Sequence, residues 1–144
     1  MSRLAFAAFT FLAAGCAPTN MPPERDLGSL VRLSQSEVQA FFADAIIRHG
    51  DPETGEVADP GEMMCGNGYF ARLQSRVPIR GRWSAEGGEV CHRIEGLALT
   101  SGSCFAVYRG SDGRTFAMRT GESQPSTEIF RGEDMTERCE EVGP

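Results

Sequence analysis

Two sets of residues in this 144-residue chain could perform nucleophilic chemistry. Cys91 directly precedes His92, and a thiolate beside an imidazolium is a known nucleophile. Neighbouring residues of a strand point to opposite faces, so the two cannot readily meet if this segment is a strand. The residue types of a hydrolytic triad are also present, in Ser101, Ser103, His92 and Asp112. The sequence has no G-x-S-x-G turn that would position the serine. We therefore expect no catalytic residues and no enzyme activity.

Metal binding is a second chemistry to weigh. Met63-Met64-Cys65, together with His49 and His92, offers soft ligands that suit copper. Methionine pairs in turns more often pack in a core, and His49 falls near the end of a predicted helix, where the helix dipole explains it. The acidic segment 51–62 lacks the D-x-D-x-D-G order of a calcium loop. We expect no cofactor and no metal.

Arginine is the only strongly basic residue type in the sequence, which contains no lysine and has a net charge of −6. Several arginines fall in the predicted strands, where they could gather on one sheet face and bind phosphates or carboxylates of an anionic envelope polymer. The alternative is that they pair with the protein's own acidic loop and tail. This possible anion-binding set comprises Arg72, Arg80, Arg82, Arg93, Arg114 and Arg119. An acidic chain is not expected to bind nucleic acid.

The N-terminus has the layout of a secretory signal. Arg3 is followed by an uncharged run and then by small residues, and this run is too short for a transmembrane helix. Leu12-Ala13-Ala14-Gly15-Cys16 resembles the lipobox of bacterial lipoproteins. The resemblance implies removal of residues 1–15 and acylation of Cys16, with diacylglycerol on its thiol and a further chain such as palmitate on its amine. Ala17, where an aspartate often retains lipoproteins in the inner membrane, implies an outer-membrane lipoprotein that faces the periplasm.

Lipidation of Cys16 would leave four cysteines, which can pair in an oxidising periplasm. Four cysteines allow three pairings. Cys91 and Cys104 lie on consecutive predicted strands, so an antiparallel return could bring them opposite each other. We therefore predict disulfides Cys91–Cys104 and Cys65–Cys139, the second of which would tie the acidic C-terminal tail to the domain.

The mature chain divides into a tether over 16–32, rich in proline, and a single domain over 33–144. Ser34-Gln35-Ser36-Glu37 matches a capping box, the signature of a helix start. Apolar residues then recur at helical spacing, and Gly50 stands where the helix should stop. The residues of this amphipathic stripe are Val38, Phe41, Phe42, Ala45 and Ile46.

Beyond the helix the pattern changes to about six short β runs separated by turn signals. The runs are 69–73, 81–84, 89–94, 104–109, 114–119 and 127–131. Glu86-Gly87-Gly88 and Ser111-Asp112-Gly113 are typical of tight hairpin turns. We predict an α+β fold in which the helix covers or plugs an antiparallel meander that could curl into a small barrel. Its core should include Trp83, Phe105, Val107 and Phe116 besides Val38, Phe41, Phe42 and Ile46.

A second resemblance covers residues 33–120. Gly81-Arg82-Trp83, Val90-Cys91 and the run from Cys104 to Tyr108 resemble a set of small exported proteobacterial proteins with a G-x-W, C and CF pattern on successive strands. The resemblance implies no function.

We therefore expect a non-enzymatic cell-envelope lipoprotein, an accessory or binding module attached to the membrane through its N-terminal lipid. Its partner would be an anionic envelope polymer or an envelope protein. A periplasmic small-ligand-binding barrel or enzyme inhibitor is the alternative, and a hydrolase is a more distant one. A ligand-binding barrel would require a buried pocket lined by the inward-facing, alternating residues of its strands.

Overall fold

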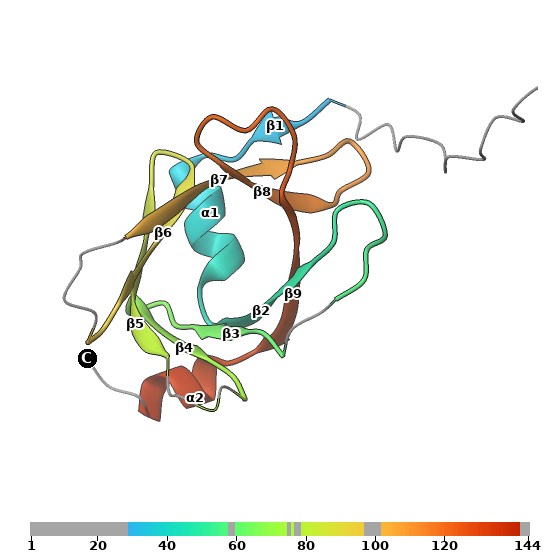
Figure 1. The fold of residues 1–144 in the computed structure, drawn as a ribbon. Helices are drawn as coiled ribbons and strands as arrows, with labels where there is room; N and C mark the ends of the chain where they lie inside the picture. Colours follow the sequence, from blue (N-terminus) through green and yellow to red (C-terminus); the bar gives the residue numbers. More distant parts are fainter. Residues whose placement is uncertain (1–28, 58–59, 75, 77–78, 97–101, 142–144) are drawn as a thin grey trace, which may run out of the picture.

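The protein folds into a closed β-barrel. The structure is a computed structural model that describes residues 29–57, 60–74, 76, 79–96 and 102–141. Eight antiparallel strands follow one another around the barrel as a meander (Figure 1). They are β2 (Ala45–Gly50), β3 (Glu62–Met64), β4 (Tyr69–Arg72), β5 (Arg80–Glu86), β6 (Glu89–Ile94), β7 (Ser103–Arg109), β8 (Thr115–Arg119) and β9 (Thr127–Asp134).

Pairing of the first barrel strand with the last closes the ring. Each strand from β2 to β9 pairs with its neighbour in sequence, and β9 also pairs with β2, from Gly50 opposite Glu128 to Ala45 opposite Asp134. A short additional strand, β1 (Val31–Arg32), pairs with the end of β7. Closure leaves each barrel strand with a neighbour on both sides, which removes the exposed edges of an open sheet.

All six predicted strand segments are strands, and both predicted hairpin turns join neighbouring strands. Gly87 and Gly88 have positive φ in the β5–β6 turn, and Gly113 has positive φ between β7 and β8. The predicted strand number was too low, because β2 and β3 complete the barrel and β1 lies beside it. The described fold is thus mostly β, with two short helices.

The first helix, α1 (Gln35–Phe42), starts as predicted and ends earlier. Ser34 and Glu37 form the reciprocal capping box. The chain leaves the helix at Ala43, Asp44 adopts a left-handed φ of 53°, and Ala45 begins β2. The Arg131 guanidinium donates to carbonyls of the last helical turn, including that of Phe41, which satisfies acceptors that a helix end leaves open. The predicted helix over Ala45 and Ile46 was therefore wrong.

Helix α1 closes one end of the barrel. Figure 1 looks through the ring of strands and shows α1 within it. Val38 and Phe42 are buried, and Phe42 packs against the predicted core residue Trp83 with ring centroids 6.1 Å apart. Trp83 is 5% exposed and donates its indole N–H to the Cys65 carbonyl over 2.7 Å. Burial of a tryptophan with its polar atom satisfied makes it a core residue rather than an exposed ligand platform.

The other predicted core residues divide between different surfaces of the barrel wall. Val107 belongs to the interior cluster, against which Phe41 and Phe105 pack while partly buried. Ile46 belongs instead to a second cluster outside the barrel. Phe116 is fully buried but belongs to neither cluster. It lies beneath the Arg114 guanidinium, whose Cζ is 4.9 Å from the centroid of the Phe116 ring.

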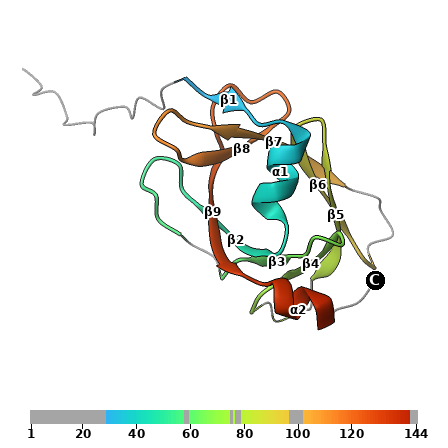
Figure 2. The ribbon, with the colours of Figure 1, turned by 180° about the vertical axis from the view of Figure 1, so that it is seen from behind.

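The second helix, α2 (Thr136–Glu141), packs outside the barrel (Figure 2). It covers a cluster that includes Ile46, Met63 and Met135, and the disulfide Cys65–Cys139 joins it to the end of β3. A second disulfide joins Cys91 and Cys104, which are opposite one another on β6 and β7. Both bonds are the predicted ones. Neither described helix has the length and hydrophobicity to cross a membrane.

The two disulfides should contribute unequally to stability. Cys65 and Cys139 are 74 residues apart, and Cys91 and Cys104 are 13 apart. In the chain-entropy model, replacing the first pair by alanine should lower the free energy of unfolding by about 4.5 kcal/mol, and replacing the second by about 3 kcal/mol. Urea unfolding of the two double variants checks this order, and a greater loss from the Cys91–Cys104 pair would contradict it.

Candidate functional site

A cavity of about 610 Å³ occupies the barrel interior beyond α1. Its walls are built from the ends of β2, β4, β6 and β8 and the starts of β3, β5, β7 and β9. In an up-and-down barrel these positions all belong to one end, the end opposite the β5–β6 and β7–β8 hairpins. The helix side chain Phe42 also lines the cavity, so α1 separates it from the packed end of the barrel.

The alternation of the strands explains which side chains enter the cavity. Val90, His92 and Ile94 line it from β6, whereas Cys91 points to the outer face, where its disulfide lies. Ala117 and Arg119 alternate in the same way on β8. Successive residues of a strand point to opposite faces, so every second residue of each barrel strand faces the interior.

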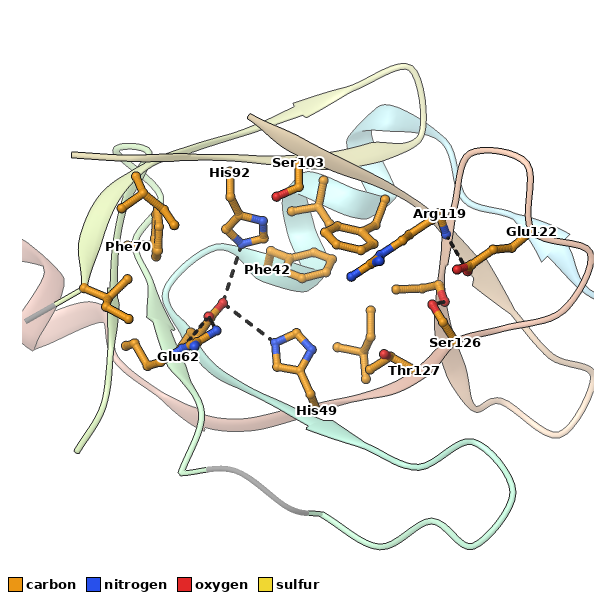
Figure 3. Close-up of a pocket in the computed structure, with 17 residues that line it drawn as sticks. Phe42, His49, Glu62, Phe70, His92, Ser103, Arg119, Glu122, Ser126 and Thr127 are labelled. Carbon is orange, nitrogen blue, oxygen red and sulfur yellow. Dashed lines mark hydrogen bonds and ion pairs between the residues drawn. The ribbon is translucent and has the colours of Figure 1, made fainter. Parts of the chain in front are cut away.

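A buried carboxylate forms the polar part of the cavity wall. Glu62, at the start of β3, is only 5% exposed, and one of its oxygens accepts hydrogen bonds from Arg72 Nε and Nη2 at 3.1 and 2.8 Å. Its other oxygen lies 3.7 Å from Nε2 of His49 and 3.6 Å from Nε2 of His92. Figure 3 shows both imidazoles pointing toward this carboxylate, His49 from β2 and His92 from β6. The only two histidines of the sequence therefore meet at one acidic side chain.

Glu62 is ionised despite its burial. Burial alone would raise its pKa, but the interaction with His49, the charge of His92 and the Arg72 hydrogen bonds lower the pKa to about 2. The attraction of the two histidines adds to that of the permanent Arg72 charge, and together they outweigh the effect of burial. The Arg72–Glu62 ion pair therefore has no net charge.

His92 behaves differently. Burial lowers its pKa, an effect that the Glu62 charge opposes and the charges of His49 and Arg72 reinforce, so the ring is neutral at pH 7. Among the described residues, its buried Nε2 has no hydrogen-bond partner. Buried polar atoms are nearly always paired with protein, water or ligand, so this atom is available to a molecule in the cavity.

The rim of the cavity carries a separate group of polar residues. Arg119 ends β8, and its side chain extends into the cavity (Figure 3). Glu122, in the β8–β9 connection, accepts a hydrogen bond from the Arg119 backbone N–H over 3.0 Å. This bond, together with one from Ser126, lowers the pKa of Glu122. Ser103 and Thr127 complete the rim.

The six arginines predicted as an anion-binding set do not share one face, which corrects that expectation. Arg72 and Arg119 face the cavity, whereas Arg82 and Arg93 are opposite one another on the exposed face of β5 and β6. Arg80 forms an exposed ion pair with Glu95. On the outer face near Phe116, Arg114 binds both oxygens of Glu128 and, over 2.9 Å, the Pro52 carbonyl. The alternating geometry of the strands disperses these charges.

The other chemistries weighed from the sequence find no assembled site in the described part of the chain. His92 and Ser103 are opposite each other on β6 and β7, but Asp112 lies in the β7–β8 turn at the other end of the barrel, and Ser101 is outside the described residues. Met63 packs under α2 and Met64 is buried in the interior. The described residues bring three residues with metal-binding side chains close together, Glu89, Cys91 and Cys104, but both sulfurs are in a disulfide.

Sequence reasoning missed the main polar residues of the site. Glu62 was treated as one carboxylate of an acidic loop, and His49 as the end of a helix. Both belong to barrel strands, β3 and β2, that the sequence pattern did not predict. A signal was present in the buried run Glu62-Met63-Met64, since a charged residue beside an apolar run can mark a strand end that faces a cavity.

Comparison of the chain with protein-family models, with curated proteins and with solved structures found no match.

Ionised Glu62 should make the fold sensitive to acid. Its pKa of about 2 in the folded protein lies below the ordinary value of 4.5, so its stabilising effect is present above pH 4.5 and is lost as the pH falls toward 2. The group should account for up to about 3 kcal/mol of the loss in unfolding free energy over this window. Urea unfolding at pH 5 and pH 3 should show that the free energy of unfolding falls less between these pH values for Glu62→Gln than for the native protein. The exposed carboxylate variant Glu133→Gln, as a control, should behave like the native protein.

Proposed function

We propose that this chain is a non-enzymatic cell-envelope protein that binds a small, largely apolar molecule inside its barrel. The observation that carries the proposal is the interior cavity. Its volume of about 610 Å³ is within the ~300–1,000 Å³ typical of small-molecule sites. Apolar side chains such as Phe42, Phe70 and Ile129 form much of its wall, and a few polar groups converge on it. This combination is typical of ligand sites in small barrels.

The chemistry of the polar groups favours binding over catalysis. All four cysteines beyond the N-terminal segment are in disulfides, so none offers a thiolate. Ser103 is exposed at the rim. His92 is opposite it on the neighbouring strand, but the Nε2 of His92 is directed toward Glu62 and not toward the serine. A hydrolase needs a nucleophile, a base and oxyanion donors that converge on one point. The His–Glu–His cluster instead offers hydrogen-bonding groups to a bound molecule.

The two disulfides indicate an oxidising, extracytoplasmic compartment. The lipobox-like segment ending at Cys16 lies outside the described residues. We propose that acyl chains on Cys16 attach the barrel to the outer membrane. The segment 16–32 would act as the tether except at Val31–Arg32, which form β1 and belong to the folded domain. Lipidation would place the cavity next to a source of apolar ligands.

Binding of a neutral apolar fluorophore tests the ligand-binding proposal. N-phenyl-1-naphthylamine should bind the purified protein with one site and an enhanced emission. Ala117→Leu should weaken binding by about tenfold or more, because Ala117 is 5% exposed and its side chain faces the cavity. Ala106→Leu, which adds the same atoms on the outer face of the neighbouring strand, should leave binding unchanged.

Near-UV circular dichroism of each variant establishes that it is folded, and Thr127→Leu provides a second change at the cavity rim. A folded native protein that does not bind the fluorophore, or equal binding by the Ala117→Leu and Ala106→Leu variants, would overturn the proposal.

Lipid attachment at Cys16 has its own test. Cells that express the protein in the presence of radiolabelled palmitate should incorporate label into the native chain and not into a Cys16→Ser variant. Cys91→Ala/Cys104→Ala, which removes two other cysteines, should still be labelled. Release of an unlabelled native protein into the soluble periplasmic fraction would contradict membrane attachment.

A further inference from the structure

The charges that line the cavity are compensated unevenly. Glu62 is bound by Arg72, so this end of the cavity carries no net charge. Glu122 at the rim accepts the Arg119 backbone N–H, not its guanidinium, and stays in contact with water. Among the described residues, the ion pairs of the other arginines are with Glu62, Glu89, Glu95, Asp112 and Glu128, and none involves the Arg119 guanidinium. The Arg119 guanidinium therefore experiences the Glu122 charge at longer range, but no carboxylate among the described residues is bound to its N–H donors.

The surroundings of Arg119 hold its charge over an apolar wall. Its Cζ lies 5.7 Å from the ring centroid of Phe105 on the neighbouring strand, a cation–π contact. Figure 3 shows the side chain reaching from the rim toward Phe42. A guanidinium in this position presents its forked N–H donors to the interior, the geometry that suits a carboxylate or a phosphate.

The ionised carboxylate of Glu62 sets the direction in which a ligand would lie. Because Arg72 already binds this carboxylate, the histidine end attracts neither an anion nor a cation strongly, and the charged group of an anionic ligand is drawn to Arg119 instead. Between the two ends the wall includes Phe42, Phe105 and Ile129. The cavity thus has an arginine at its rim, an apolar middle and a neutral, hydrogen-bonding floor.

We infer that the bound molecule is an amphiphile with one anionic group, a carboxylate or a phosphate, which Arg119 binds at the rim while the apolar part lies against Phe42 and Phe105. The inference rests on the proposed ligand-binding function and specifies its ligand class. The Nε2 of His92, which has no hydrogen-bond partner among the described residues, would meet the inner end of the molecule where that end carries a polar group. Lipid-derived acids and phosphates share this chemistry.

Two fluorophores with the same aromatic body separate the anionic contribution from the apolar one. 1-Anilinonaphthalene-8-sulfonate carries one negative charge, and N-phenyl-1-naphthylamine is its neutral counterpart. Arg119→Gln should weaken binding of the sulfonate by roughly five- to tenfold and change binding of the neutral probe by less than about twofold. Arg93→Gln, which removes an exposed arginine on the outer face of β6, is the matched control and should change neither affinity.

Competition then identifies the anionic group. Decanoate or decyl phosphate should displace the sulfonate probe at lower concentration than decanol, which has no charge. Stronger displacement by decanoate indicates a free carboxylic acid as ligand, and stronger displacement by decyl phosphate indicates a phospholipid-derived one. Both outcomes support an anionic amphiphile.

Failure of this inference is distinguishable from failure of the proposed function. If the neutral probe binds but Arg119→Gln leaves sulfonate binding unchanged, or if decanol competes as well as the anions, the anionic ligand class is wrong and the ligand-binding barrel stands. Tighter binding of decylamine than of decanoate would assign the cavity to a cationic ligand and overturn the inference. If neither fluorophore binds, the proposed function itself fails.

Discussion

Closure of the barrel by pairing of β2 with β9 is the constraint on which the other features depend. These strands are far apart in sequence, and their pairing is interrupted by a register shift between Ala45 and Ile47. It places Arg131 of β9 beside the end of α1, so the same contact that closes the sheet also helps end the helix. It also brings His49 next to Ile129, completing the cavity wall. Without this pairing the sheet would have two open edges and no enclosed interior.

The buried Glu62 cluster illustrates how the barrel accommodates charge. An isolated carboxylate at this depth would be strongly destabilising, and the bidentate bond from Arg72 offsets that cost. Arg72 is itself about half exposed, so its charge remains partly hydrated while it neutralises a buried partner. The result is a polar floor without net charge, and such a floor can coexist with an apolar ligand. At the rim, by contrast, no carboxylate among the described residues forms an ion pair with Arg119.

The two disulfides stabilise different parts of the structure. Cys91–Cys104 joins neighbouring strands that already pair, so it reinforces local structure on the outer face. Cys65–Cys139 fixes α2 over Ile46 and Met63, covering an apolar surface that the closed sheet would otherwise expose. Neither bond contributes a side chain to the cavity, which leaves the interior surface to the strands and α1.

The sequence alone determined the features that depend on near neighbours. The helix start at Ser34 rests on hydrogen bonds to Glu37, three residues away, and the β5–β6 hairpin rests on two glycines with positive φ. The six predicted strands follow from alternation within each segment. The disulfide pairing also followed, because Cys91 and Cys104 lie on strands joined by one short connection, which left one partner for Cys65.

The structures of Ala45–Gly50 and Glu62 depend on contacts between segments that are distant in sequence. Ala45 and Ile46 continue the helical spacing of α1, but burial on both faces, inside the barrel and under α2, together with backbone pairing to β9, makes the segment a strand. The burial of Glu62 as a carboxylate depends on Arg72 and on two histidines from other strands. Such long-range pairing leaves no periodic mark on the sequence, because its stabilisation comes from partners that only the closed barrel brings together.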